Sequence, residues 1–135
     1  MSARDLNEAL DAVARPLRGL SGLARLLPAV AGGIGCAAAP TILEHGSDDV
    51  KQRLLRPIVT GEDTWCQLFS EPGSGSDLAG LTTRAELDGY EYVINGQKLW
   101  STSAHHARWG MLLARTNWDV PKHRGISYFA IEMQQ

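Results

Sequence analysis

The sequence predicts an α+β fold, in which N-terminal helices are followed by an antiparallel β-domain. Two observations support this prediction. Apolar residues recur at helical spacing in the first part of the chain, and from Thr64 onward the pattern changes to the short period of strands. Tight-turn signals then separate short runs that are rich in aromatic and β-branched residues. The chain is therefore expected to divide into a helical segment, residues 1–61, and a β-domain, residues 62–135.

The composition is typical of a soluble globular protein and argues against two classes of partner. Of 135 residues, 44% are hydrophobic, and 13 basic residues against 15 acidic ones give a net charge of −2. This balance offers no electrostatic basis for binding nucleic acid or a membrane. The uncharged stretch 26–43 approaches the length of a membrane span, but its prolines and glycines favour a buried helix. Acidic residues occupy the place of a basic leader, so we expect a cytoplasmic protein.

No metal site or hydrolytic site is predicted. Cys36 and Cys66 lack metal-type spacing, and a buried thiol in a reducing cytosol is favoured over a disulfide. His105 and His106 are adjacent, so on a strand they would face opposite ways and could not bind one metal ion together. Three carboxylates have no partner that is evident from the sequence: Glu44, Glu62 and Glu71.

Three helical stretches are predicted before residue 47. Residues 5–14 form a short amphipathic helix, residues 20–28 have mixed helical character, and a third helix ends at His45, because Gly46 is a typical stop signal. Residues 33–38 match the loose dinucleotide pattern G-x-G-x-x-A, but no strand precedes them. We therefore interpret these small residues as a surface for close helix packing.

The last predicted helix has a clear start signal. Ser47 is its expected N-cap, and Asp48 and Asp49 lie in the first turn, where the positive end of the helix dipole favours them. Pro57 is expected to limit its length, and Gly61 opens the turn that follows. The predicted buried stripe consists of Val50, Leu54 and Leu55.

About six strands are expected in the β-domain. The predicted strands are residues 65–69, 82–87, 90–94, 97–102, 109–115 and 125–132. Asp88-Gly89 and Asn95-Gly96 are two-residue hairpin turns, so the second, third and fourth strands should form an antiparallel meander. A sheet that stops near Gln135 would leave an open edge, which is an aggregation liability.

The strongest functional signal lies at the end of the first strand and in the loop after it. Leu68–Ser70 can present backbone N–H groups and one hydroxyl, and the small loop Gly73–Asp77 can wrap a pyrophosphate or a pantetheine. Trp100, followed by Ser101 and Thr102, offers an aromatic plane beside hydroxyl groups. These features predict a site for a phosphorylated or heteroaromatic ligand.

Two stretches of the chain resemble signatures of the acyl-CoA dehydrogenase family. Residues 65–79, Trp-Cys-Gln-Leu-Phe-Ser-Glu-Pro-Gly-Ser-Gly-Ser-Asp-Leu-Ala, resemble the start of its middle β-domain. Residues 95–102, Asn-Gly-Gln-Lys-Leu-Trp-Ser-Thr, resemble its second signature. The resemblance implies an FAD cofactor and a fatty acyl-CoA substrate. It also implies α,β-desaturation, in which a glutamate takes the α-proton and flavin N5 takes a hydride from the β-carbon.

The resemblance also implies roles for individual residues. The FAD-binding residues that it implies are Gln67, Leu68, Phe69, Ser70, Trp100, Ser101 and Thr102. Gln67–Ser70 would hold the pyrimidine edge of the flavin, with the Ser70 hydroxyl as a donor. Trp100 would flank the isoalloxazine, and Thr102 would bond near its reactive edge. Ser76 would contact phosphate or the acyl-CoA.

The departures from the family pattern limit what is expected of the chain. Its resemblance covers the end of the N-terminal helical domain and most of the middle β-domain. The family's C-terminal helical domain, which supplies the catalytic glutamate and most of the oligomer interface, has no counterpart here. No catalytic base is assigned, so a truncated form with little or no activity is expected. An electron-accepting flavoprotein is an implied partner. Two alternatives stay open: a non-catalytic binding or assembly module, and a flavin monooxygenase of the same fold.

Overall fold

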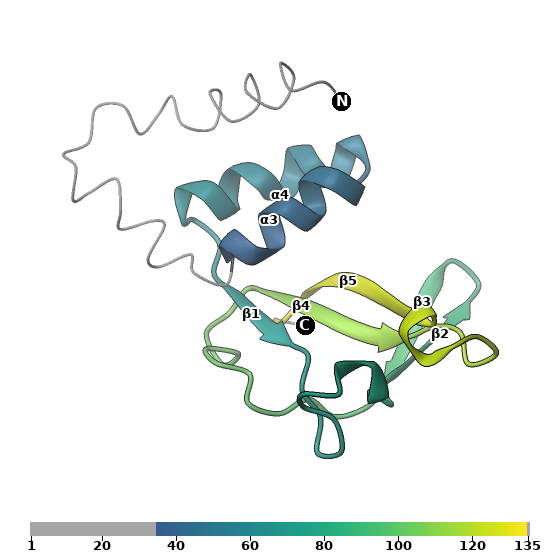
Figure 1. Cartoon of the computed structure of the whole chain (residues 1–135). Helices are drawn as coiled ribbons and strands as arrows, with labels where there is room; N and C mark the ends of the chain where they lie inside the picture. The colour runs from purple at the N-terminus through teal and green to yellow at the C-terminus, as the bar shows by residue number, and fades with distance from the viewer. Residues whose placement is uncertain (1–34, 135) are drawn as a thin grey trace. The chain divides into compact units, whose positions relative to one another are not determined.

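The computed structural model describes residues 35–134, which form two compact units that divide between Thr64 and Trp65 (Figure 1). The first unit contains two helices, and the second contains a sheet of five strands. This arrangement confirms the α+β class. The helices expected at residues 5–14 and 20–28 lie outside the described residues.

Helix α3 (Gly35–His45) and helix α4 (Asp48–Thr60) pack against each other. The predicted boundary between them is confirmed, because the N–H of Gly46 donates to the carbonyl of Ile42 at 2.8 Å and ends α3. Ser47 caps α4, since its Oγ accepts a hydrogen bond from the backbone N–H of Val50 at 3.4 Å. Neither of these described helices is long and apolar enough to cross a membrane.

Helix α4 departs from the prediction in two details. It continues past Pro57 to Thr60 and ends at Gly61, which adopts the left-handed conformation at φ 73. A proline removes one helical hydrogen bond, but a left-handed C-cap glycine is the stronger stop signal at this position. The buried residues of the two helices are Ala38, Ile42, Leu54 and Ile58, whereas Val50 and Leu55 are only half-buried.

The sheet of the second unit is built around β4. Its strands are β1 (Trp65–Leu68), β2 (Arg84–Asp88), β3 (Glu91–Asn95), β4 (Trp109–Arg115) and β5 (Ile126–Glu132). Strand β5 pairs antiparallel with all of β4, while β1 pairs parallel with its first half and β2 joins it in parallel at Arg115. Strand β3 pairs antiparallel with β2. The sheet is therefore mixed, whereas the sequence predicts an antiparallel one.

The core of this unit is formed by residues of β1, β2 and β4 and of the segment just before β4. Its buried members are Cys66, Leu68, Ala85, Ala107, Leu112 and Ala114. Cys66 is a free buried thiol, as predicted, and burial raises its pKa. The rings of Trp65 and Trp109, which are paired across β1 and β4, stack with their centroids 5.8 Å apart. The side chain of Cys36 lies outside the described residues.

The hairpin of β2 and β3 turns one residue later than predicted. Asp88 pairs with Glu91 across the ladder, so the two turn residues are Gly89 and Tyr90. Gly89 has a φ of 63, and a positive φ at the first turn position is the reason that glycine is favoured there.

The strand expected at 97–102, and with it the three-stranded meander, is wrong. After β3 the chain leaves the ladder at Gly96, which lies so close to Thr83 that an added Cβ would overlap its side chain. The N–H of Leu99 then donates to the carbonyl of Ser70 at 2.8 Å. This segment therefore bonds to the loop after β1 instead of to β3.

His105 and His106 also differ from expectation. They lie in a turn, not on a strand, and their rings come together with the centroids 3.9 Å apart. The expectation that they face opposite ways is therefore wrong. Within residues 35–134, no group of three or more potential ligands could hold a metal ion.

Gly96→Ala is expected to lower the free energy of unfolding by about 1–3 kcal/mol, because the new Cβ would overlap Thr83. Gly73→Ala is the matched control, since a Cβ there meets nothing within 4 Å, and its effect should stay within about 0.5 kcal/mol. Urea unfolding followed by tryptophan fluorescence measures both. Equal midpoints for the two variants would contradict the close approach at Gly96.

Candidate functional site

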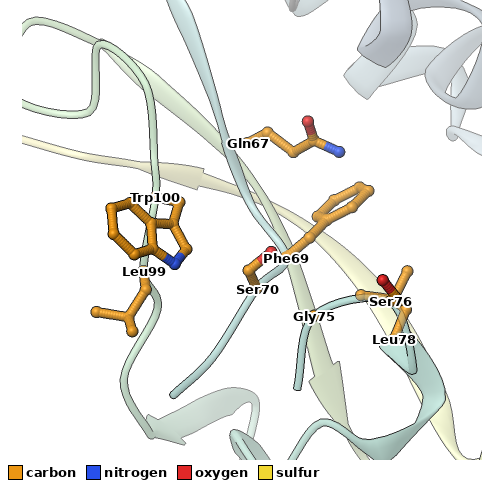
Figure 2. Close-up of a pocket in the computed structure, with 8 residues that line it drawn as sticks. All are labelled: Gln67, Phe69, Ser70, Gly75, Ser76, Leu78, Leu99 and Trp100. Carbon is orange, nitrogen blue, oxygen red and sulfur yellow. The ribbon is translucent and has the colours of Figure 1, made fainter. Parts of the chain in front are cut away.

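A cleft of about 340 Å³ opens where the end of β1, the loop after it and the segment after β3 meet (Figure 2). Its lining residues are Gln67, Phe69, Ser70, Gly75, Ser76, Leu78, Leu99 and Trp100. They come from the two stretches that carry the sequence signal, and all belong to the second unit. The volume is near the lower end of the range for small-molecule sites, about 300–1,000 Å³.

Five of the eight predicted site residues line this cleft: Gln67, Phe69, Ser70, Ser76 and Trp100. Leu78 and Leu99 line it as well, although the sequence analysis did not identify them. Both lie within the two signature stretches: Leu99 directly precedes Trp100, and Leu78 follows Ser76 by two residues. Their apolar side chains carry no chemical signal, so only their place in the sequence could have indicated them.

The other three predicted residues do not line the cleft. The side chain of Leu68 is buried in the core, because alternation along β1 turns it away from Gln67 and Phe69. Ser101 and Thr102 lie in the turn after Trp100. Ser101 is half-buried, and Thr102 is exposed. For Leu68, contact with a cofactor would have to come from the backbone.

The cleft combines an aromatic plane with uncharged hydrogen-bonding groups. Trp100 is 88% exposed, so almost all of its indole is available to a ligand. Ser70 and Ser76 add hydroxyl groups, and Gly75 leaves the loop open, because a Cβ there meets nothing within 4 Å. None of the lining residues has an acidic or basic side chain. The arrangement suits a flat heterocycle with polar edges.

Trp100 adopts an unusual backbone conformation, a left-handed one with φ 56. This region is uncommon for non-glycine residues and unfavourable for bulky ones. Hydrogen bonds bracket the residue on both sides. Leu99 donates to the Ser70 carbonyl before it, and the N–H of Thr102 donates to the carbonyl of Trp100 at 3.1 Å after it. The chain around Trp100 is thus fixed by contacts with the opposite wall of the cleft and within its own turn.

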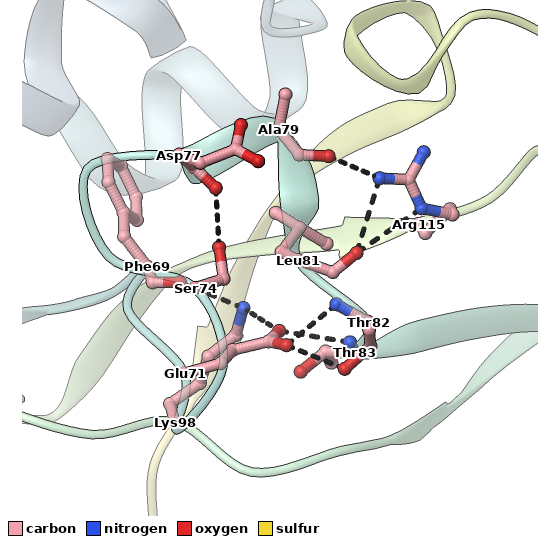
Figure 3. A network of polar contacts seen from close by, with 10 residues as sticks. All are labelled: Phe69, Glu71, Ser74, Asp77, Ala79, Leu81, Thr82, Thr83, Lys98 and Arg115. Atoms are coloured by element: carbon pink, nitrogen blue, oxygen red, sulfur yellow. Dashed lines mark hydrogen bonds and ion pairs between the residues drawn. The ribbon is translucent and has the colours of Figure 1, made fainter.

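A buried polar network is centred on Glu71 and Lys98, which adjoin cleft residues in the chain (Figure 3). Glu71 Oε1 accepts hydrogen bonds from Lys98 Nζ at 2.7 Å and from the Thr83 N–H at 2.9 Å. Its Oε2 accepts from the N–H and hydroxyl of Thr82 at 2.6 and 2.8 Å. Lys98 Nζ also donates to the carbonyl of Phe69 at 3.2 Å. Glu71, which has no evident partner in the sequence, therefore has a charged partner 27 residues away.

The charge state of Glu71 follows from these contacts. Burial raises the pKa of its carboxyl group, but the hydrogen bonds from Lys98 and from the Thr82–Thr83 pair outweigh burial and lower the pKa to about 2. Glu71 and Lys98 are a buried ion pair with side chains only 4% and 8% exposed. Glu71 also exchanges two backbone hydrogen bonds with Ser74. These bonds close the turn at the start of the loop Gly73–Asp77, termed the glycine loop.

Arg115, which is 5% exposed, bonds to the backbone just after the glycine loop (Figure 3). Its guanidinium donates to the carbonyls of Ala79 at 2.6 Å, Leu81 at 3.2 Å and Lys122 at 2.8 Å. Within the loop, Ser74 Oγ donates to the carbonyl of Asp77 at 2.7 Å. Both ends of the loop are therefore tied to buried charged side chains.

The low pKa of Glu71 predicts how stability depends on pH. A carboxyl group whose pKa falls from 4.5 to about 2 on folding contributes stability that is complete above pH 4.5 and is lost as the pH falls toward 2. The contribution is up to about 3 kcal/mol. The stabilities of the wild type and Glu71→Gln in urea unfolding should therefore differ most at pH 7, and the difference should shrink as the pH falls from 4.5 toward 2. A constant difference would contradict the assigned ionisation.

Comparisons with known proteins agree with this geometry. The family model described as the acyl-CoA dehydrogenase middle domain matches residues 66–135. The acyl-CoA dehydrogenase FadE34 of Mycobacterium tuberculosis is 54% identical over 100 residues, which cover 74% of this chain and 14% of that protein.

Solved structures give the same result. The ChsE4-ChsE5 complex from Mycobacterium tuberculosis matches with a TM-score of 0.69 and 34% identity, covering 94% of this chain and 31% of that one. A glutaryl-CoA dehydrogenase from Mycobacterium smegmatis, solved in complex with FADH2, matches with a TM-score of 0.63 and 30% identity. That match covers 72% of this chain and 24% of the enzyme.

The chain thus spans between 14% and 31% of the length of these relatives. The middle-domain model covers more than half of the chain, and every residue that lines the cleft lies within the matched range. The chain belongs to the acyl-CoA dehydrogenase family and carries its middle domain.

Proposed function

We propose that the chain forms the flavin-binding wall of an FAD-dependent acyl-CoA dehydrogenase that desaturates an acyl-CoA thioester between its α- and β-carbons. One observation carries the proposal: the cleft places the exposed indole of Trp100 beside uncharged hydrogen-bonding groups of the first signature stretch. The family membership and the FADH2 complex of the glutaryl-CoA dehydrogenase support it.

The lining residues fit part of a flavin. The exposed face of Trp100 suits stacking against an isoalloxazine, and the Ser70 hydroxyl and the amide of Gln67 suit the polar edge of its pyrimidine ring. Ser76 lines the cleft from the open loop, which supports its proposed contact with phosphate or the acyl-CoA. A cleft of about 340 Å³ accommodates one heterocycle, not a whole dinucleotide. Bound FAD would supply the hydride acceptor of the reaction.

The same geometry argues against a catalytic base in this wall. The lining residues include no carboxylate. Glu71, whose backbone adjoins Ser70, is engaged by Lys98 and the two threonines, and a carboxyl group with a pKa of about 2 is a poor proton acceptor. We propose that the base is contributed from outside residues 35–134. ChsE4-ChsE5 is a complex of two components, and we propose a comparable assembly as one way to complete this site.

Trp100→Ala is expected to weaken the binding of FAD to the purified chain by about tenfold, because a stacking surface is lost. Tyr90→Ala is the control: Tyr90 is a fully exposed aromatic residue in the turn between β2 and β3, and it does not line the cleft. Titration with FAD, followed by flavin fluorescence, gives both affinities. An equal loss in the two variants, or no binding by the wild type, would count against the flavin site.

Turnover is the second test. The chain, loaded with FAD and mixed anaerobically with an acyl-CoA, should leave the flavin absorbance unbleached, because its cleft offers no proton acceptor. Addition of the family's C-terminal helical domain, which supplies the catalytic glutamate, is expected to allow bleaching. Bleaching by the chain alone would show that a base lies within these 135 residues. Oxygen-dependent hydroxylation without acyl-CoA would instead favour the monooxygenase alternative.

A further inference from the structure

We propose that Glu71 and Lys98 are a positioning pair, which holds Ser70 and Trp100 in register across the cleft. The inference rests on the proposed flavin site, because its functional consequence is the geometry offered to the cofactor. Neither member of the pair lines the cleft, so each acts through its chain neighbours.

The two residues lie next to opposite walls of the cleft. Glu71 directly follows Ser70 on one wall, and Lys98 precedes Trp100 by two residues on the other. Lys98 Nζ bridges the walls, since it contacts Glu71 Oε1 at 2.7 Å and the carbonyl of Phe69 at 3.2 Å. One ammonium group thus bonds to two residues of the opposite wall, which flank Ser70 on either side.

The pair also supports the unusual conformation of Trp100. Between Lys98 and Trp100, the N–H of Leu99 donates to the carbonyl of Ser70 at 2.8 Å. Trp100 itself has a φ of 56, which costs conformational energy and persists only where the surroundings impose it. The ion pair and the Leu99 hydrogen bond immobilise the two residues before Trp100, and so present its indole to the cleft.

Burial makes the two charges depend on each other. The side chains of Glu71 and Lys98 are 4% and 8% exposed, so removal of either partner leaves a buried charge without its counterion. Such a charge is expected to move toward water, and the segment that carries it moves as well. The Asp77–Lys122 pair has the same length, 2.7 Å, but its side chains are 63% and 59% exposed. This exposed pair is therefore a matched control within the second unit.

A flavin-free experiment tests the pair alone. The chain has four tryptophans, so the ¹⁵N-labelled protein should show four indole N–H signals. In Glu71→Gln and Lys98→Met, the Trp100 signal should shift or broaden, while those of Trp65 and Trp109, stacked within the sheet, keep their wild-type positions. Lys122→Met should leave the Trp100 signal unchanged. Wild-type Trp100 signals in both pair variants would overturn the proposal, as would equal changes in all four signals.

The conservative variant keeps the proposal testable if both pair variants unfold. Lys98→Arg retains the charge but cannot reproduce the contacts of a single ammonium nitrogen with Glu71 and Phe69. It should fold and still displace the Trp100 signal selectively. A folded Lys98→Arg protein with an unchanged Trp100 signal would overturn the proposal.

Flavin titration then tests the link to function. Glu71→Gln and Lys98→Met should each weaken FAD binding at least about tenfold and reduce tryptophan quenching at saturation, and the double variant should bind no more weakly than the more impaired single variant. Arg84→Met, which removes an exposed ion pair with Glu86 on β2, should bind as the wild type does. Additive losses would contradict a pair that acts as a unit. If the wild type binds no FAD, the proposed function fails, and the indole signals still decide whether the pair positions Trp100.

Discussion

The segments around the cleft are connected by one buried ion pair. Glu71 and Lys98 lie 27 residues apart in the sequence, and each lies outside the strands of the sheet. Four hydrogen bonds converge on the Glu71 carboxylate, including two from backbone N–H groups that precede β2. Each buried charge requires the other. The pair therefore connects three segments: the loop after β1, the residues before β2 and the segment after β3.

The sheet supplies the rigid frame that supports these three segments. Strand β4 is paired along both edges, and its side chains are almost entirely buried. At its end, Arg115 anchors the carbonyls beyond the glycine loop, so that a segment of small residues has fixed ends and an open middle. A loop of this kind can let the backbone approach a ligand closely without losing its position.

Much of this architecture could be predicted from local signals. The stop at Gly46, the cap at Ser47 and the strands β4 and β5 follow from residue types whose preferences act over a few positions. Five residues from the two signature stretches that were predicted to form a site also line one cleft. The helix signals act within a few residues, and the strand signals are local preferences of residue type, although the strands themselves form by pairing with one another.

The wrong predictions have the opposite cause. Asn95-Gly96 is a good hairpin signal, but the close approach of Gly96 to Thr83 and the attraction between Lys98 and Glu71 draw the chain away from the ladder. The parallel pairing of β1 with β4 likewise joins segments that are far apart in sequence. Long-range contacts of this kind leave no periodic trace, so turn chemistry and alternation alone could not reveal them.

A cleft whose lining side chains carry no acidic or basic group has a consequence for how such enzymes diversify. Under the proposed function, recognition of the flat ring and removal of the proton would be carried by separate parts of the complete enzyme. Substitutions in the proton-transferring part would then adapt the reaction to a new thioester while the proposed ring-binding wall stays unchanged. In such an arrangement the wall contributes shape and rigidity, because its lining side chains include no acidic or basic group.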